Sequence, residues 1–177
     1  TDRFEAFAVR WPVLEGVNGE GLLLRPRGEV KARVVALPDA DQTPEMIAGL
    51  EPGVKPQSQF ARKLAESGCE VVVPMLIDRS DTYSGNPKFR MTNQPHREWV
   101  YRGAFEMGRH IIGYEVQKAL AAVDWLKQGD VNGKIGVFGY GEGGLLALYS
   151  AAVDTRIDST GVSGYFGSRE NLWYEPI

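Results

Sequence analysis

The pattern of apolar and polar positions predicts strands that alternate with helices. Residues 4–11 and 21–25 have the apolar content of strands, and the Asn18-Gly19 pair between them favours a tight turn, so the chain is expected to open with a hairpin. Four further segments have the short, apolar character of strands, and two of them are apolar enough to be covered on both faces of a sheet. They are residues 30–37, 69–74, 134–139 and 160–165, of which the second and third are the most continuously apolar.

Helices are expected between these strands. Thr43 and Pro44 supply a cap and a first-turn proline for a short helix, and Ser58 is the expected cap of a second helix. Apolar residues that recur every three or four positions predict a long helix over residues 110–127, and another is expected over 145–153. Strands and helices in this alternation imply a parallel sheet with helices on its faces, an α/β fold.

One connection is longer than the others. The segment that begins at Asp78 is polar and rich in Gly, Pro, Asn and aromatic residues, and its length of about 20 residues exceeds the usual connection inside a domain. We therefore expect one domain over residues 1–177, with a long loop or lid-like insertion over residues 78–98.

The amino-acid composition argues against several classes of partner. Twenty Lys and Arg residues against 23 Asp and Glu residues give a net charge of −3 with no block of either sign, so no nucleic-acid partner is expected. No apolar run approaches the ~20 residues of a membrane-spanning helix, which favours a soluble protein of unassigned compartment. One Cys and two His residues give no metal-ligand spacing, so neither a metal nor another cofactor is expected.

The strongest motif is the run Gly-Tyr-Gly-Glu-Gly-Gly at residues 139–144, between a strand and a helix. Gly139, Gly141 and Gly144 fit the GxGxxG pattern, which would place a dinucleotide pyrophosphate at the start of the helix. Because the run neither opens the domain nor precedes a strand ending in an acid, an NAD(P)-binding oxidoreductase is only a third alternative. The same run fits the nucleophile elbow GxSxG, except that Gly141 occupies the position of the serine.

The succession of these elements resembles the α/β-hydrolase superfamily. The resemblance rests on the opening hairpin, Pro38-Asp39 after the third strand, the helix that contains residues 121–126, and the glycine-rich turn. Within that superfamily the chain is most similar to the dienelactone hydrolase and acetyl xylan esterase-like branch. The resemblance implies a three-layer sandwich around a mostly parallel sheet, with an N-terminal antiparallel hairpin and with the C-terminal part of the fold absent from this chain.

The resemblance also implies a relationship to carboxylic-ester hydrolases. Family members order their triad as nucleophile, acid and histidine, whereas His96 and His110 both precede Gly141 here. We therefore expect an esterase-like pseudoenzyme without serine-hydrolase activity. The oxyanion donors that the family pattern implies are the backbone N–H of Glu142 and that of Asp39 or Ala40.

Other roles remain open. The Glu142 side chain could act as a general base for water, or it could be a first-turn helix acid favoured by the helix dipole. A non-catalytic ligand- or partner-binding domain is the main alternative function, and a small ester or sugar-ester is the expected ligand. An open sheet edge predicts that a partner chain or a missing C-terminal segment covers it. The residues expected to border a pocket are Asp78, Arg79, Tyr140, Arg169 and Trp173.

Overall fold

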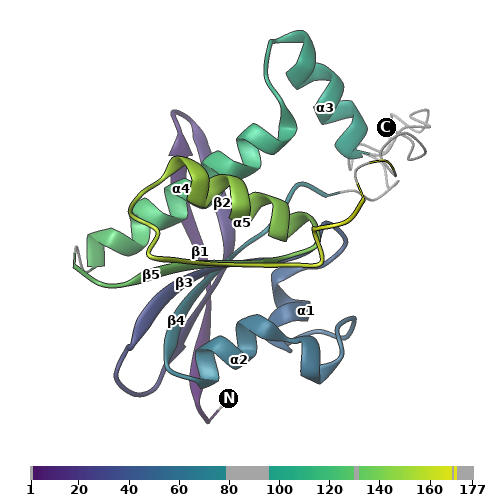
Figure 1. The fold of residues 1–177 in the computed structure, drawn as a ribbon. Helices are drawn as coiled ribbons and strands as arrows, with labels where there is room; N and C mark the ends of the chain where they lie inside the picture. The colour runs from purple at the N-terminus through teal and green to yellow at the C-terminus, as the bar shows by residue number, and fades with distance from the viewer. Residues whose placement is uncertain (1, 79–95, 130–131, 169, 171–177) are drawn as a thin grey trace.

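A six-stranded mixed sheet forms the centre of the protein (Figure 1). The computed structural model describes residues 2–78, 96–129, 132–168 and 170. Within them the strand order is β1-β2-β4-β3-β5-β6; β2 is antiparallel to β1 and β4, and the other neighbouring pairs are parallel. The strands are β1 (Phe4–Leu14), β2 (Val17–Pro26), β3 (Ala32–Leu37), β4 (Cys69–Pro74), β5 (Ile135–Tyr140) and β6 (Ser159–Ser163). The expected α/β fold with an N-terminal hairpin is confirmed.

Helices cover both faces of the sheet and give three layers (Figure 1). One face carries α1 (Pro44–Ala48), the short 3-10 helix η1 (Pro56–Ser58) and α2 (Phe60–Glu66), whose alanines pack with the apolar residues of β2, β3 and β4. The other face carries α4 (Ile111–Gly129) and α5 (Glu142–Val153), which pack on β3 and β5. None of the described helices has the length and apolar character that crossing a membrane would require.

Valines at the middle of the sheet fill both of its faces: Val71 and Val73 of β4 pack with α1 and α2, and three others pack on the side of α4 and α5. Val35 of β3 lies opposite Val72 of β4 and Val137 of β5, and all three are almost completely buried. Branched apolar side chains suit a pleated surface that is covered on both sides. The pattern of short apolar strands in the sequence therefore correctly predicts a sheet with helices on both faces.

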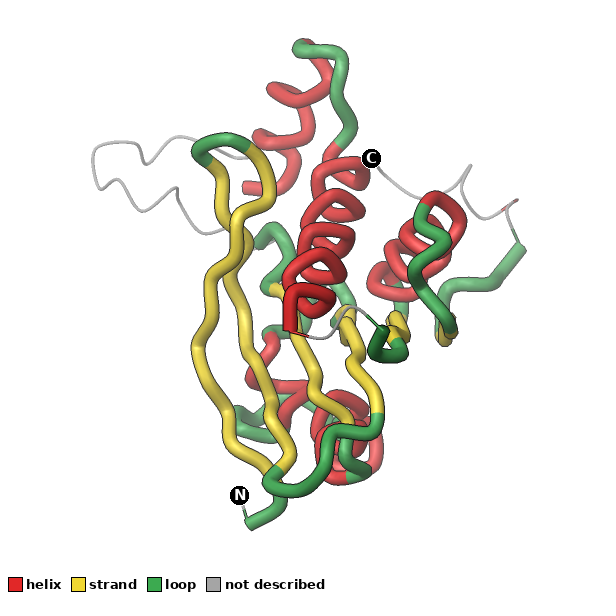
Figure 2. The backbone as a smooth tube through the Cα atoms, turned by 90° about the vertical axis from the view of Figure 1, so that its left-hand side faces the viewer, coloured by secondary structure: helices red, strands yellow, loops and turns green. Residues whose placement is uncertain are grey.

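The opening hairpin extends along α4 (Figure 2). Trp11 is only 1% exposed, its ring stacks on Trp125 with 6.3 Å between centroids, and its Nε1–H donates to the carbonyl of Lys118 at 3.4 Å. Gly19 lies opposite Trp11, where a Cβ would come within 2.6 Å of the indole. The hairpin is thus anchored to α4 by an aromatic contact as well as by strand pairing.

Three local expectations are wrong. The hairpin turns at Glu15 and Gly16, where Gly16 adopts φ 74°, whereas Asn18 and Gly19 lie inside β2 and pair with β1. Glycine readily takes this left-handed conformation, so the turn forms there.

The other two wrong expectations concern the starts of helices. Ser58 lies in η1, and Gln59 takes the N-cap position of α2 without a capping side chain, because its buried Nε2 donates to the Val54 carbonyl at 3.0 Å. Helix α5 begins at Glu142 rather than at residue 145, because the glycines of its first turn allow it to start directly against the sheet.

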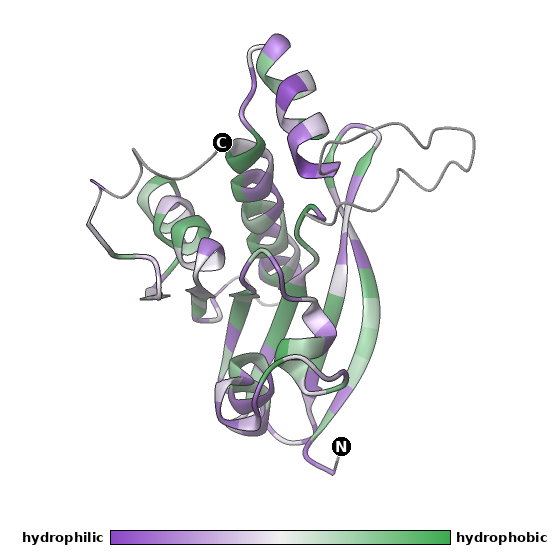
Figure 3. Ribbon diagram, turned by 90° about the vertical axis from the view of Figure 1, so that its right-hand side faces the viewer, coloured by the Kyte–Doolittle hydropathy of each residue, from purple (hydrophilic) through white to green (hydrophobic). Residues whose placement is uncertain are grey.

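A helix that the sequence pattern does not predict follows the long connection. It is α3 (His96–Glu106), so residues 96–98 of the expected insertion are helical, while residues 79–95 lie outside the described part of the chain. Only Ala104 of α3 is buried, and Trp99 and Phe105 are exposed. Figure 3 shows its mixed hydropathy, in contrast to the mostly hydrophobic central strands of the sheet. Because the helix is polar on average and buries one residue, its sequence resembles that of a loop.

Candidate functional site

The turn between β5 and α5 has the backbone of a tight elbow. Gly141 adopts φ 58° and ψ −122°, and its N–H donates to the carbonyl of Ser163 at 2.9 Å. A side chain at this φ would strain the backbone, whereas glycine adopts it readily. The residue at the position expected for a nucleophile therefore lies at the tip of a sharp strand-to-helix turn, at the carboxyl end of β5.

The glycines on either side of the tip permit close backbone approach. A Cβ on Gly139 would lie 1.9 Å from the carbonyl oxygen of Gly143, and a Cβ on Gly143 would lie 2.1 Å from the carbonyl oxygen of Leu37. These distances are far inside van der Waals contact, so both positions require glycine. Small residues two positions before and after the tip are what the elbow motif prescribes.

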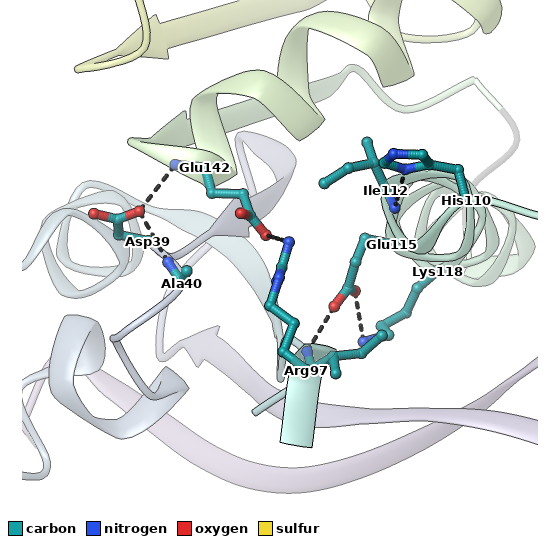
Figure 4. A network of polar contacts seen from close by, with 9 residues as sticks. Asp39, Ala40, Arg97, His110, Ile112, Glu115, Lys118 and Glu142 are labelled. Atoms are coloured by element: carbon teal, nitrogen blue, oxygen red, sulfur yellow. Dashed lines mark hydrogen bonds and ion pairs between the residues drawn. The ribbon is translucent and has the colours of Figure 1, made fainter. Parts of the chain in front are cut away.

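The carboxylate of Asp39 occupies the space above the tip (Figure 4). Its Oδ1 accepts hydrogen bonds from the N–H of Glu142 and the N–H of Ala40, both at 2.9 Å. A Cβ on Gly141 would lie 2.3 Å from the same oxygen. The N–H groups of Ala40 and Glu142 thus converge on one point, whereas the N–H of Asp39 itself donates to Gln42 Oε1 at 3.3 Å.

The side chain of Glu142 points away from this point and pairs with α3. Its Oε1 lies 2.7 Å from Nη2 of Arg97, and the two side chains are 11% and 15% exposed (Figure 4). An acid in the first turn of α5 also interacts favourably with the helix dipole. The ion pair connects the unpredicted helix α3 to the start of α5.

A second buried carboxylate fixes the chain that leaves β4. Glu115 of α4 is almost completely buried; its Oε1 accepts from the N–H of Ile77 at 2.6 Å, and its Oε2 lies 2.7 Å from Nζ of Lys118. The same Nζ donates to the Met75 carbonyl at 2.7 Å. Figure 4 shows this group beside Arg97. His110 acts locally, since its Nδ1 accepts from the N–H of Ile112 at the start of α4.

A cavity of about 420 Å³ opens next to the turn on the face that carries α2. Tyr140, the residue before the tip, forms part of its wall and is 44% exposed. Aromatic and polar side chains both line the cavity, which suits a small polar ligand with an apolar part. The side chains on its wall include Gln42, Lys55, Phe60, Phe138, Tyr140 and Ser163.

The other expected pocket residues are not brought together by the described structure. Asp78 is exposed at the end of the segment that follows β4, while Arg79, Arg169 and Trp173 lie outside the described residues. Across the part of the chain that the structure describes, no three His, Cys, Asp or Glu side chains are grouped to hold a metal ion.

Sequence reasoning identified the turn but missed two of its contacts. The sequence predicts a role for the backbone N–H of Asp39, whereas in the structure its carboxylate contacts residue 142, 103 positions away. The sequence places Arg97 in the long loop, as a candidate contact for an acidic or sugar-like ligand, and it does not predict the helix that brings Arg97 to Glu142. A polar residue directly after Pro38, at the carboxyl end of a buried strand, is the one signal that pointed to Asp39.

Solved structures share this fold at low sequence identity. A Bacteroides fragilis protein assigned as an acetyl xylan esterase aligns with a TM-score of 0.68 and 19% identity over 90% of this chain and 44% of its own. Dienelactone hydrolase from Anabaena variabilis aligns with a TM-score of 0.57 and 21% identity, over 91% of this chain and 63% of its own. Brefeldin A esterase, a bacterial homologue of human hormone-sensitive lipase, aligns with a TM-score of 0.58 and 17% identity, over 98% of this chain and 45% of its own. The chain therefore spans less than two thirds of the length of each.

The family assignment rests on the sequence model of one family. No curated protein matches the chain. The model of the dienelactone hydrolase family matches residues 30–174, which contain the turn, Asp39 and all strands after the hairpin. The fold of the solved structures and the elbow geometry agree with that match. The chain belongs to the dienelactone hydrolase family.

Proposed function

We propose that this member of the dienelactone hydrolase family derives from carboxylic-ester hydrolases and has no serine-hydrolase activity of its own. The family match and the esterase folds support the relationship to ester hydrolases. The observation that carries the proposal is the elbow at Gly141, which has the required backbone turn and no side-chain nucleophile. Because acyl transfer depends on its nucleophile, loss of that group removes covalent catalysis.

The remaining role of the carboxyl edge is to bind a ligand without reacting with it. The cavity of about 420 Å³ beside Tyr140 supports this role, because it lies next to the turn and combines aromatic with polar walls. A small ester or sugar-ester suits such a lining, with the apolar part against Phe60 and Phe138. The protein then acts as a ligand-binding relative of the esterases.

Two other functions have less support. General base catalysis by Glu142 would need its carboxylate at a substrate, but this carboxylate pairs with Arg97 at 2.7 Å. A dinucleotide would place its pyrophosphate on the first amides of α5, where the Asp39 carboxylate already accepts the N–H of Glu142. Like charges at this distance repel, which disfavours the pyrophosphate.

A fluorophosphonate probe and p-nitrophenyl acetate test the lack of covalent catalysis. The complete protein should show no probe adduct by intact mass and no burst of p-nitrophenol, because position 141 offers no hydroxyl. An active esterase of known sequence serves as positive control. A stoichiometric serine adduct in the folded protein would contradict the proposal.

Ligand binding is tested separately by thermal shift with a panel of acetylated sugars and aryl esters. We expect at least one compound to stabilise the protein, since binding to the native state alone raises the melting temperature. Tyr140→Ala should remove the shift because it opens the wall of the cavity, whereas Tyr149→Ala, on the exposed surface of α5, should retain it. Equal shifts in both variants would place the ligand elsewhere.

We also propose that a partner chain or further residues of the protein cover β6. Among the described strands β6 pairs only with β5, and its residues are exposed or half-buried. Uncovered edges with free backbone groups promote association. In the complete protein, the amides of residues 159–163 that point away from β5 should exchange slowly with deuterium, and rapid exchange at these amides would contradict this proposal.

A further inference from the structure

We propose that Asp39 is a built-in occupant of the oxyanion site, whose carboxylate keeps carbonyl oxygens and small carboxylate ligands away from the N–H groups of Ala40 and Glu142. The inference rests on the proposed descent from ester hydrolases, because that relationship makes these two N–H groups the expected oxyanion donors. It goes further by assigning the Asp39 side chain a blocking role at that place.

The carboxylate of Asp39 is hydrogen-bonded to both of these N–H groups. One oxygen, Asp39 Oδ1, accepts from two backbone N–H groups that belong to different segments, the loop after β3 and the start of α5. Both distances are 2.9 Å, the range of charge-assisted bonds between an N–H and a carboxylate. A tetrahedral oxyanion needs such a pair of converging donors, and here an internal anion already uses them.

The loop that carries Asp39 is held in place. The N–H of Asp39 donates to Oε1 of Gln42 at 3.3 Å, and the N–H of Gln42 donates back to the carbonyl of Asp39 at 3.0 Å. These reciprocal bonds fix the backbone of the loop, so the carboxylate stays over the turn. Displacing it would require breaking both N–H contacts to Oδ1.

The absence of a side chain at Gly141 is coupled to this carboxylate. A Cβ at residue 141 would lie 2.3 Å from Oδ1, 2.4 Å from Cγ and 2.6 Å from Oδ2 of Asp39. No serine fits at the tip while Asp39 holds its position. The residues at positions 39 and 141 therefore depend on each other. In an active elbow the space at the tip would hold a nucleophile and the N–H groups would bind the oxyanion, and here the Asp39 carboxylate uses both.

The chemistry of the excluded ligand follows from the contacts. Any group that competes with Oδ1 must bring an acceptor atom to both N–H groups, and in a fold related to ester hydrolases that acceptor is the oxygen of a carbonyl or carboxylate group. An incoming carboxylate also meets the negative charge of Asp39, which adds repulsion to the steric conflict. Removal of the Asp39 side chain should therefore open a site for small carboxylates.

The experiment compares three variants in the complete protein by titration with sodium acetate at constant ionic strength, followed through the amide resonances of Ala40 and Glu142. Asp39→Ala should bind acetate at least about tenfold more tightly than the wild type, because two charge-assisted bonds become available. Asp39→Asn should bind no better than the wild type, since its side-chain oxygen still fills the site. Asp41→Ala removes one charge from the same loop without touching the N–H groups, and should also match the wild type.

Several outcomes overturn the inference. Asp39→Ala that binds acetate no better than Asp41→Ala excludes a blocked site, and Asp39→Asn that binds like Asp39→Ala excludes occupancy by the side-chain oxygen. If Asp39→Ala does not fold, the wild type and Asp39→Asn decide, because loss of a charged acceptor should move both amide protons upfield. Unchanged amide shifts would overturn the assignment. The fluorophosphonate test uses Asp39 intact, so its failure is distinguishable from any of these.

Discussion

Two carboxylates at opposite ends of the central sheet, Glu70 and Asp39, are held in different ways. At the amino ends of the parallel strands, Glu70 of β4 accepts from Nε of Arg25 and from Nε of Arg33, both at 3.1 Å, beside a cavity of about 440 Å³. At the carboxyl ends, Asp39 accepts from the backbone N–H groups of Ala40 and Glu142, beside a cavity of similar size. Glu70 is thus held by side chains, and Asp39 by the backbone.

The difference indicates where chemistry is possible. A carboxylate held by two arginines makes a closed arrangement that stabilises the fold, and replacing it would leave guanidinium groups to be solvated. Backbone donors remain in place whatever the side chains are, so an external oxygen can replace the internal one. The carboxyl end is therefore the end at which substitution can change function without removing the donors.

The largest effect is expected for Gly139→Ala at the carboxyl end. Its Cβ would lie 1.9 Å from the Gly143 carbonyl oxygen, and neither backbone can move without separating α5 from β5, so unfolding free energy should fall by about 3 kcal/mol. Gly136→Ala in the same strand is the control, because its Cβ would lie at an ordinary 3.6 Å from the nearest atom. Urea denaturation measures both, and equal losses would show that the close approach is not maintained in solution.

A smaller loss is expected for Glu70→Ala at the amino end. The side chain is 13% exposed, and its removal takes an acceptor from two guanidinium groups, which should cost about 2 kcal/mol. Glu20→Ala is the matched control, because its ion pair with Arg10 is exposed and should contribute less than about 1 kcal/mol. If the two variants lose the same stability in urea, the amino end is not the charge-paired region described here.

The smallest effect concerns pH. Hydrogen bonds from Arg156 hold the pKa of Asp154 below its usual value, so the stabilisation is present above the unfolded-state pKa and is lost as pH falls through the folded-state pKa. Asp154→Asn should therefore weaken the fold near neutral pH and flatten the loss of stability on acidification. Asp124→Asn, which also contacts Arg156 but is 53% exposed, should change the profile less. Thermal melts between neutral and acidic pH test this order.

The fold was predictable because the residues that it buries form recognisable patterns in the sequence. The valines of β4 and the repeated apolar positions of α4 appear in the sequence as a short continuous run and a helical stripe. Helix α3 was not predictable, since only Ala104 is buried and the helix is positioned by the Arg97 to Glu142 ion pair. A tertiary contact of that kind leaves no local pattern.

The candidate site was predictable in its backbone and not in its side chains. The glycines at positions 139, 141 and 143 are required because a side chain at any of them would clash with neighbouring atoms. Their spacing is visible in the sequence. Asp39 reaches the N–H of Glu142 because β3 and β5 lie side by side and α5 begins directly after β5, so this contact emerges only from the folded chain. The roles expected for Arg79, Arg169 and Trp173 stay predictions.

The stacked indoles of the hairpin and α4 give the protein an intrinsic optical reporter. Trp11 and Trp125 lie 6.3 Å apart and nearly parallel, at 19°, on segments far apart in the sequence. Two such chromophores in fixed orientation interact electronically, so the pair should contribute a near-ultraviolet circular dichroism band that disappears when the hairpin detaches. Rapid-mixing measurements at that wavelength would time the docking of the hairpin independently of strand formation.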